Sequence, residues 1–403
     1  MSTIFFTSIL SNYLSRALLL AQSVILRHSD ACFRIYLYDY EDLARGSLDS
    51  LLALLDPACR DRISFYSSRA CLPLFSQFDN RFTVVEACTA VKPFIAKSLL
   101  EGHACVVYLD PDCYVYSSLY NSSDSFSSAS WSLQLTPHTL SPALSMPLSE
   151  RIFLSYGVFN LGYFAVKPTA EALAFLDWWS YMVDFYGVDS PSSGNFVDQK
   201  PLDLAPAFIS NLDIVRSPGW NVAWWNLFCD GRRVQADHTV SFGGAVCQLV
   251  FFHFSNIDRS LNPLVARPLR ELIVDENLCR LSTYPLLSTL YDDYLSSLDK
   301  LNQDVGRLVA FARPSVGLGS RGRFARLVNS ELYRLVSAPG LNSATAPSYQ
   351  KFSSYHLVAK VILLLYLSSK AGIGVRKNFV RRLRRFASSL FGPTLYDYTS
   401  TFR

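Results

Sequence analysis

Two periodicities of apolar positions alternate along the first part of the chain. Apolar runs at Thr3–Ser8 and Cys32–Tyr38 predict buried strands, and the helical spacing of apolar residues between them predicts a helix over Asn12–His28. Another apolar run predicts a strand at Cys105–Leu109. Strands that alternate with helices in this way predict an α/β fold with a mainly parallel central sheet and flanking helices.

The same two patterns continue further along the chain. Helices are predicted at residues 48–55, 84–100 with an interruption at Pro93, and 170–186, and strands at Phe159–Val166 and Gln248–Phe254. After about residue 265 the strand pattern fades and helical segments dominate. The sequence therefore predicts an α/β domain over residues 1–265 and a helical, basic region over residues 266–403.

Positive charge is concentrated in the C-terminal region. Residues 301–403 hold 16 Lys and Arg against three Asp and Glu, although the net charge of the whole chain is only +4. Over residues 376–390, apolar residues at helical spacing are interleaved with Lys and Arg. Such a helix is suited to peripheral contact with an anionic membrane surface, or equally to packing on the α/β domain. No nucleic-acid-binding motif accompanies it, so no nucleic acid is expected as a partner.

The cysteines and apolar segments favour a cytoplasmic protein, peripheral on the inner face of the membrane if the basic helix binds there. Nine cysteines are scattered without a CxxC or zinc-finger spacing, which predicts reduced core residues. Arg16 interrupts the apolar N-terminus, so an amphipathic helix is expected there and not a signal peptide. The longest apolar run, Leu357–Leu367, is too short to cross a bilayer.

Two carboxylates follow the strand predicted at Cys105–Leu109. Asp110 and Asp112 flank Pro111, at the edge of a parallel sheet where ligands bind. Carboxylates in this arrangement can share one divalent cation that leaves positions open for substrate phosphates. The alternative is a plain surface turn, because Asp and Pro are favoured in turns.

Three other places carry polar residues in apolar surroundings. His253 lies near the end of an apolar strand. It can serve there as a third metal ligand, or it can be a hydrogen-bonded core residue. Asp198 and Gln199 follow a turn. They can form hydrogen bonds with a sugar there. Alternatively, Asp198 can cap the N-terminus of a helix. Asn160 and Gly162 lie within a strand, as expected for close approach of a ligand or for a bulge.

The order of these motifs resembles that of nucleotide-sugar glycosyltransferases of the GT-A fold. The chain is most similar to the glycogenin-like and bacterial lipopolysaccharide galactosyltransferase group, over about residues 1–260. The matching segments are Asp110–Asp112, Phe159–Gly162, Val197–Gln199, Asn221 and His253–Ser255.

The resemblance implies a role for each matching position. Asp110, Asp112 and His253 would bind Mn²⁺ or Mg²⁺ that bridges the donor diphosphate. Asn160, Asp198 and Gln199 would line the donor sugar, with Gln199 near the anomeric carbon. The other positions implied to bind the nucleotide-sugar donor are Thr7, Ser8, Tyr13, Asp39, Lys92, Gly162 and Asn221, with Asp39 near the base.

Two features depart from the family. Family members usually follow the histidine with a Gly-Lys-Pro segment that contacts the diphosphate, whereas this chain has Asn256–Arg259, so Arg259 is expected to replace the lysine. A cluster of tryptophans, Trp220, Trp224 and Trp225, is suited either to stacking on a sugar or to core packing.

Together these features predict a metal-dependent glycosyltransferase. The expected donor is a nucleotide-diphosphate sugar, most simply a UDP-sugar, and the expected acceptor is a hydroxyl of a glycan or of a lipid-linked saccharide. The group resemblance implies retention of configuration; an inverting enzyme would need a base, for which Asp198 is the candidate. The alternative function is a catalytically inactive GT-A domain that serves as a binding or scaffold module.

Overall fold

The computed structural model describes residues 2–42, 45–72, 78–120, 130–142, 148–191, 194–235, 237–257 and 285–309. The chain divides into two compact units, one of residues 1–76 and 82–316 and the other of residues 77–81 and 317–403. Of the described elements, only α4 (Phe78–Arg81) lies in the second unit. Arg259, the predicted boundary near residue 265 and the basic segment 376–390 lie outside the described residues.

A seven-stranded sheet forms the centre of the first unit, in the order β10-β6-β7-β4-β1-β2-β3. β1 to β4 are parallel, β7 runs antiparallel to both of its neighbours, and β10 is parallel to β6. This sheet confirms the predicted mainly parallel α/β fold. Its strands are β1 (Thr3–Ile9), β2 (Cys32–Leu37), β3 (Ile63–Ser67), β4 (Cys105–Leu109), β6 (Leu133–Pro137), β7 (Phe159–Val166) and β10 (Leu212–Ile214).

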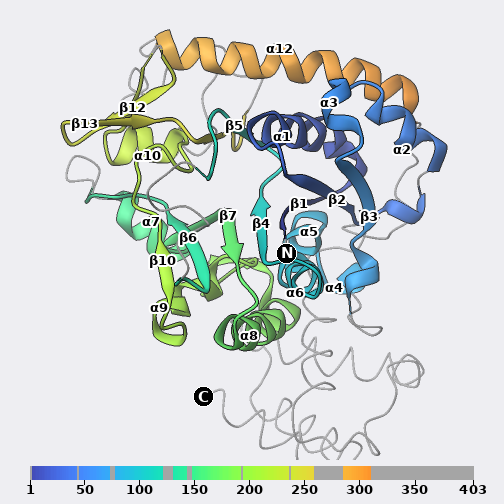
Figure 1. The fold of residues 1–403 in the computed structure, drawn as a ribbon. Coiled ribbons are helices and arrows are strands. Elements are labelled where there is room, and N and C mark those ends of the chain that lie inside the picture. The colour runs from blue at the N-terminus through green and yellow to red at the C-terminus, as the bar shows by residue number, and fades with distance from the viewer. Residues whose placement is uncertain are drawn as a thin grey trace, which may run out of the picture. The chain divides into compact units, whose positions relative to one another are not determined.

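Helices cover both faces of this sheet (Figure 1). The helices nearest the sheet are α1 (Leu14–Arg27), α5 (Val84–Ala90), α6 (Lys92–Leu100) and α8 (Ala170–Tyr186). Other helical elements of this unit are η1 (Ser11–Tyr13), α2 (Arg45–Leu52), α3 (Pro57–Arg60), α7 (Leu148–Tyr156), η5 (Lys200–Leu204), α9 (Ala205–Phe208) and α10 (Trp224–Cys229). α1 is almost fully buried on its inner side, because its apolar residues recur at helical spacing.

The break predicted at Pro93 separates α5 from α6. Thr83 and Glu86 form a capping box at the start of α5. Pro93 lies in the first turn of α6, where the missing N–H costs no hydrogen bond. Lys92 therefore begins a new helix, directed at the edge of the sheet where β4 ends.

The strand predicted at Gln248–Phe254 is divided, and this part of the prediction is wrong. Residues up to Gln248 form β13 (Ala245–Gln248), the last strand of a largely exposed meander with β11 (Arg233–Val234) and β12 (Thr239–Phe242). The buried part of the run, Leu249–Phe254, contains only the short strand β14 (Phe251–His253). The division arises because the N–H groups of Leu249 and Val250 bond His238 and Gly219 in place of a strand partner.

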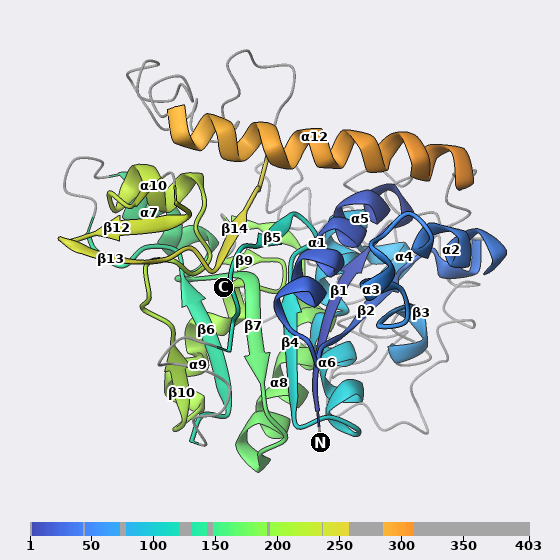
Figure 2. The ribbon, with the colours of Figure 1, turned by 45° about the horizontal axis from the view of Figure 1, so that its top comes forward.

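β14 pairs antiparallel with β5 (Cys113–Val115), so that His253 lies opposite Cys113. The last described helix, α12 (Pro285–Leu308), lies across α1 and this two-stranded ribbon (Figure 2). Its buried face packs against Phe252 and Phe254 of the ribbon and Leu19 of α1. The residues of this face include Leu287, Leu290, Tyr291, Tyr294 and Leu298.

Two further predictions concern the cysteines and the apolar segments of the chain. The eight cysteines among the described residues are all free thiols, as the sequence predicts, but only Cys59, Cys105, Cys113 and Cys229 are buried, so the predicted core location is wrong for the exposed Cys32. In the described part of the chain, no helix is both long enough and apolar enough to cross a membrane.

A buried histidine, His28, joins the end of α1 to the loop after β5. Its Nδ1 donates to the carbonyl of Val24 at 2.7 Å, and its Nε2 accepts from the backbone N–H of Leu119 at 3.0 Å. A ring that accepts at Nε2 has to be neutral. Burial accordingly lowers the pKa of His28 below its ordinary value of 6.5.

This arrangement predicts an acid-sensitive contribution to stability. As the pH falls below 6.5, the unfolded chain binds a proton at His28 that the folded chain does not bind, so the free energy of unfolding decreases. Urea unfolding at pH 7 and pH 5 measures the effect. We expect wild type to lose about 1 kcal/mol more than His28→Gln over this interval. His238→Gln, which removes an exposed histidine, is the control, and equal losses in wild type and His28→Gln would contradict the prediction.

Candidate metal and donor site

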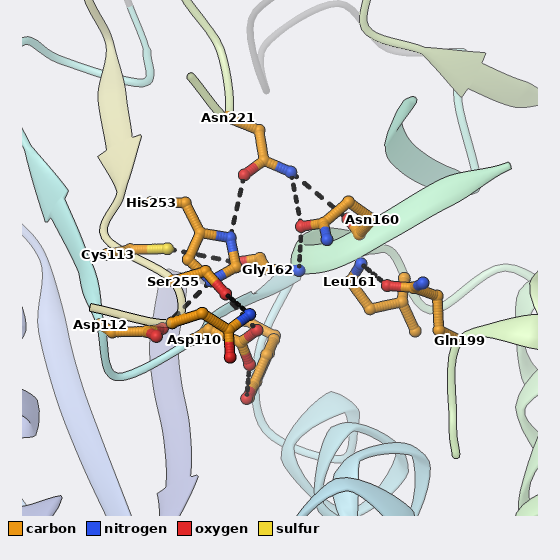
Figure 3. A network of polar contacts seen from close by, with 12 residues as sticks. Asp110, Asp112, Cys113, Asn160, Leu161, Gly162, Gln199, Asn221, His253 and Ser255 are labelled. Atoms are coloured by element: carbon orange, nitrogen blue, oxygen red, sulfur yellow. Dashed lines mark hydrogen bonds and ion pairs between the residues drawn. The ribbon is translucent and has the colours of Figure 1, made fainter. Parts of the chain in front are cut away.

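The residues singled out from the sequence gather at the carboxyl edge of the central sheet (Figure 3). Asp110 and Asp112 follow β4, and Asn160 and Gly162 lie near the start of the antiparallel strand β7. His253 enters from β14. The parallel and antiparallel strands therefore bring together side chains that are far apart in the chain.

His253 lies between the two carboxylates. Its Nε2 is 3.1 Å from Oδ1 of Asp112 and 3.7 Å from Oδ2 of Asp110. Backbone bonds hold these groups in register, because the N–H of Phe254 donates to the carbonyl of Asp112 at 2.8 Å and that of Asp110 donates to Gly162 at 3.0 Å. Side chains of Asp110 and Asp112 remain 25% and 20% exposed, so a ligand can reach them.

The charges of this group support one another. Burial lowers the pKa of His253, but the carboxylates of Asp112 and Asp110 outweigh it and raise the pKa above its ordinary value. Burial raises the pKa of Asp112, but His253 outweighs it and lowers the pKa. The imidazole therefore carries a proton on Nε2, which it has to release before that nitrogen can bind a cation.

The donor set fits a divalent cation such as Mn²⁺. Carboxylates suit Mg²⁺ and Mn²⁺, and an imidazole is a common additional ligand of first-row metals. Sγ of Cys113 also lies within 4.8 Å of ligand atoms of Asp112 and His253. However, burial raises the pKa of this thiol well above its ordinary value, and Sγ is directed at the carbonyl of Gly162 at 3.7 Å. Cys113 is therefore a packing residue beside the site.

Gly162 allows His253 to approach the sheet. A Cβ at this position would lie 2.4 Å from Nδ1 and 2.6 Å from Cε1 of the imidazole. The space next to Gly162, where the sequence predicts close approach of a ligand, is thus filled by the side chain of His253.

A second layer of amides orients the imidazole. Nδ1 of His253 donates to Oδ1 of Asn221 at 3.3 Å, which leaves Nε2 directed at the carboxylates. Nδ2 of Asn221 donates to Asn160 and to Thr136, both at 2.9 Å. Asn221 has a φ of +47°, a conformation that asparagine tolerates better than most residues, and Asn226 bonds its carbonyl. Asn221 therefore orients His253 in the way that hydrogen-bond partners orient metal-binding histidines in general.

Asn160 is engaged by the protein on both sides of its carboxamide. Its Oδ1 accepts from the N–H of Gly162 at 2.9 Å and from Asn221. Its Nδ2 lies 3.3 Å from Nε2 of His138. Burial lowers the pKa of His138 to about 4, so this imidazole is neutral and accepts the bond.

Lys92 neutralises two carboxylates in the interior. Its Nζ lies 3.2 Å from Asp110 and 3.0 Å from Asp198, and it is 4.2 Å from the ring centre of Tyr108. The Tyr108 hydroxyl also donates to Asp110, at 2.5 Å. Burial lowers the pKa of Lys92, but the two carboxylates outweigh it and raise the pKa. Lys92 is therefore a charged, almost fully enclosed residue.

Asp198 and Gln199 are both enclosed. Burial raises the pKa of Asp198 to about 6 even though Lys92 opposes the change. Asp198 does not cap a helix, because η5 begins after Gln199 without a side-chain cap. Gln199 accepts from the N–H of Leu161 and donates to the carbonyl of Tyr156, both at 3.0 Å. These contacts fix the backbone of β7 beside the ligand set.

Four of the residues predicted to hold the nucleotide lie toward the end of β1, in η1 and just after β2. The hydroxyls of Thr7 and Ser8 are buried and find no hydrogen-bond partner among the described residues. Asp39 accepts from both the backbone N–H and the hydroxyl of Ser11, so it fixes the start of η1. Tyr13 is 40% exposed at the end of η1.

The tryptophans near residue 220 are mainly packing residues. Trp220 is buried against Tyr163 and Phe251. Trp225 is 5% exposed and lies edge-on to His253, with ring centres 5.3 Å apart. The core interpretation therefore holds for Trp220, and Trp225 helps to fix the imidazole.

Three residues of the site, His138, Tyr108 and Thr136, were not predicted from the sequence. Each is a polar residue close to the end of a strand, which is the only signal that the chain offers for them. The positions of Thr136 and His138 depend on β6, and the contact of Tyr108 in β4 depends on side-chain direction in the folded sheet.

Comparisons with known proteins give distant similarities. No protein-family model matches this chain. It is similar to an uncharacterised protein, YfnF, of Bacillus subtilis (strain 168), at 24% identity over 179 residues, covering 42% of this chain. The match covers 56% of YfnF, so the chain spans about half the length of this curated relative.

Among solved structures, the chain is similar to glycosyltransferases. One is the galactosyltransferase LgtC in complex with donor and acceptor sugar analogues, at 15% identity and a TM-score of 0.38, covering 68% of this chain and 95% of LgtC. Another is mouse xyloside xylosyltransferase 1 in its apo form, at 13% identity and a TM-score of 0.39, covering 63% of this chain and 97% of that protein.

The contact between Gly162 and His253 predicts that Gly162→Ala displaces the imidazole. We expect Mn²⁺ affinity to fall about tenfold or more, as for loss of an outer-shell contact, and stability to fall by about 1–3 kcal/mol. Isothermal titration with Mn²⁺ and urea unfolding measure the two effects. Gly102→Ala is the control, since nothing lies within 4 Å of an added Cβ there. Unchanged Mn²⁺ affinity in Gly162→Ala would show that His253 does not depend on this space.

The charge balance around Lys92 predicts a large loss of stability in Lys92→Met. The substitution leaves Asp110 and Asp198 without their buried partner, which costs about 3–5 kcal/mol. Lys97→Met on the same helix removes an exposed lysine that pairs with exposed Asp177, and we expect a loss of about 1 kcal/mol at most. Chemical unfolding of both variants tests the prediction, which fails if the two lose similar amounts.

Proposed function

We propose that the chain is an enzyme that binds a nucleoside diphosphate through a divalent cation. The observation that carries this proposal is the ligand set of Asp110, Asp112 and His253, with His253 oriented by Asn221. The set lies at the carboxyl edge of a mainly parallel sheet, where ligands of such sheets bind. Side chains that are held in place in this way suit catalysis, because they need little rearrangement when the cation and the substrate bind.

Within this class, the proposed activity is glycosyl transfer from a nucleotide-diphosphate sugar, most simply a UDP-sugar. The ordered motifs, the sheet topology and the hydroxyls of Thr7 and Ser8 at the end of β1 support it. The acceptor is proposed to be a hydroxyl of a glycan or lipid-linked saccharide. Contact with an anionic membrane through residues 376–390 remains part of the same proposal.

The residues of the site are proposed to have different roles in the transfer. When bound, the cation supplies positive charge for the leaving diphosphate. Asp110, Asp112 and His253 hold it in place, and Lys92 keeps Asp110 from repelling Asp198. Asn160 and Gln199 fix the backbone of β7, which forms the wall beside the ligand set.

The burial of Asp198 favours transfer with retention over inversion. An inverting enzyme needs a base within hydrogen-bond reach of the acceptor hydroxyl. The Asp198 side chain is only 2% exposed and is paired with Lys92. In retention, the leaving diphosphate itself takes the acceptor proton, so no exposed carboxylate is required.

A thermal-shift panel of UDP, GDP, CMP and ADP, each with Mn²⁺ or with chelator, tests the proposal. One nucleoside diphosphate at 100 to 1,000 times its dissociation constant stabilises the wild type by roughly 2–4 kcal/mol. We expect this stabilisation only with Mn²⁺, and we expect its loss in Asp110→Asn and Asp112→Asn. Asp61→Asn, which changes an exposed carboxylate of the same unit, should behave as wild type.

Turnover separates the enzyme from a scaffold module. Slow hydrolysis of the matching nucleotide sugar, present in wild type and absent in Asp112→Asn, supports transferase activity. Binding without any hydrolysis or transfer would favour the inactive GT-A domain, and no binding of any nucleotide would contradict the proposal.

A further inference from the structure

Arg16 is a partly buried cation in the first turn of α1. Its guanidinium carbon lies 4.7 Å from the ring centre of Tyr13, which belongs to η1 and is 40% exposed. Stacking of this kind fixes the plane of the guanidinium and does not use its N–H groups. The pair follows β1, which runs parallel to β4 with Phe6 opposite Tyr108, so it lies at the same edge of the sheet as Asp110. In keeping with this position, the charges of Asp112 and Asp110 add to burial in raising the pKa of Tyr13.

α12 packs on the face of α1 that carries Leu19, three residues after Arg16. Tyr294 of α12 stacks on Phe254 with ring centres 3.9 Å apart, and Phe254 bonds the backbone of Asp112. The Tyr294 hydroxyl is buried. Burial raises the pKa of Tyr294, Asp112 adds to the rise and Arg16 opposes it. The stack of Tyr294 on Phe254 therefore joins α12 to Asp112, beside the face of α1 that carries Arg16.

The charge balance leaves Arg16 available for a further anion. Lys92 is almost fully enclosed and already pairs with Asp110 and Asp198. A divalent cation held by Asp110 and Asp112 is neutralised by them, whereas a nucleoside diphosphate brings at least two more negative charges. These charges need another donor of charge-assisted hydrogen bonds.

We infer that Arg16 binds the diphosphate of the nucleotide, with Tyr13 and Tyr294 holding its guanidinium in place. The inference rests on the proposed function and names a further residue of the same site. It assigns to the start of α1 the contact that the family resemblance expects from a lysine after His253. It also gives α12, which follows the predicted α/β domain in the chain, a part in the donor site.

The test is a comparison of diphosphate with monophosphate. Titration of the full chain with UDP and with UMP in the presence of Mn²⁺ measures both dissociation constants; another base replaces uracil if the panel selects it. We expect Arg16→Gln to weaken UDP binding about tenfold or more and to change UMP binding much less, because a charge-assisted bond is lost. Arg16→Lys, which keeps the charge without the planar fork, is expected to fall between the two.

Arg34→Gln is the matched control. Arg34 also stacks on a tyrosine, Tyr66, with 4.9 Å from its guanidinium carbon to the ring centre, but it lies in the middle of β2, which β1 separates from β4 in the sheet. We expect wild-type binding of both nucleotides. Melting temperatures without ligand show whether each variant folds, and if Arg16→Gln does not fold, Arg16→Lys carries the comparison.

Tyr294→Phe tests the holding role of α12. It keeps the stack on Phe254 and removes the hydroxyl, so UDP binding should weaken less than in Arg16→Gln and should not weaken further in the double variant.

The outcomes separate the inference from the proposed function. Wild-type binding of UDP by Arg16→Gln, or equal losses for UDP and UMP, overturns the assignment of Arg16 and leaves the metal site intact. If UDP binding weakens in Arg259→Gln and not in Arg16→Gln, the assignment of Arg16 is overturned as well, because the diphosphate contact then lies in the segment after His253. Failure of wild type to bind any nucleoside diphosphate overturns both.

Discussion

The enclosure of Lys92 between Asp110 and Asp198 is the interaction on which the site depends. Strands that end at one edge of a sheet bring carboxylates together, and without a cation these would repel one another in a poorly solvated interior. Lys92 supplies that cation at the first residue of a helix whose start is fixed by Pro93. It removes the repulsion on the inner side, so that the outer oxygens of Asp110 and Asp112 remain directed at His253.

Much of the fold follows from local patterns. The strands at the start of the chain and at Cys105–Leu109, the helix at Ala170–Tyr186 and the parallel arrangement were predictable, because apolar periodicity reports burial directly. β6 is not among the strands predicted from the sequence, because it is short and ends in Pro137, a residue that favours loops. β14 was joined to the end of β13 because a continuous apolar run does not reveal where a chain leaves one sheet for another.

The candidate site was predictable in its residue types but not in its contacts. The acidic pair and His253 were identified from their positions after strands, and the structure brings them together. Asn160, Gln199 and Asp39 were expected to face the donor, yet their polar atoms bond the protein. Which of two polar groups meets a ligand and which supports it depends on side-chain direction in the folded sheet, and a single sequence does not contain that information.

The pairing of β5 with β14 has a consequence for how the protein folds. β5 leaves the ribosome long before β14, and their contact closes a long loop of chain. Until β14 arrives, Asp112 has neither His253 nor the backbone bond from Phe254, and the edge of β5 has no partner strand. The central sheet can therefore form early while the metal-ligand set assembles in a late, slow step. A chain truncated before residue 251 would keep a folded sheet and lack the site, and its free strand edge would promote aggregation.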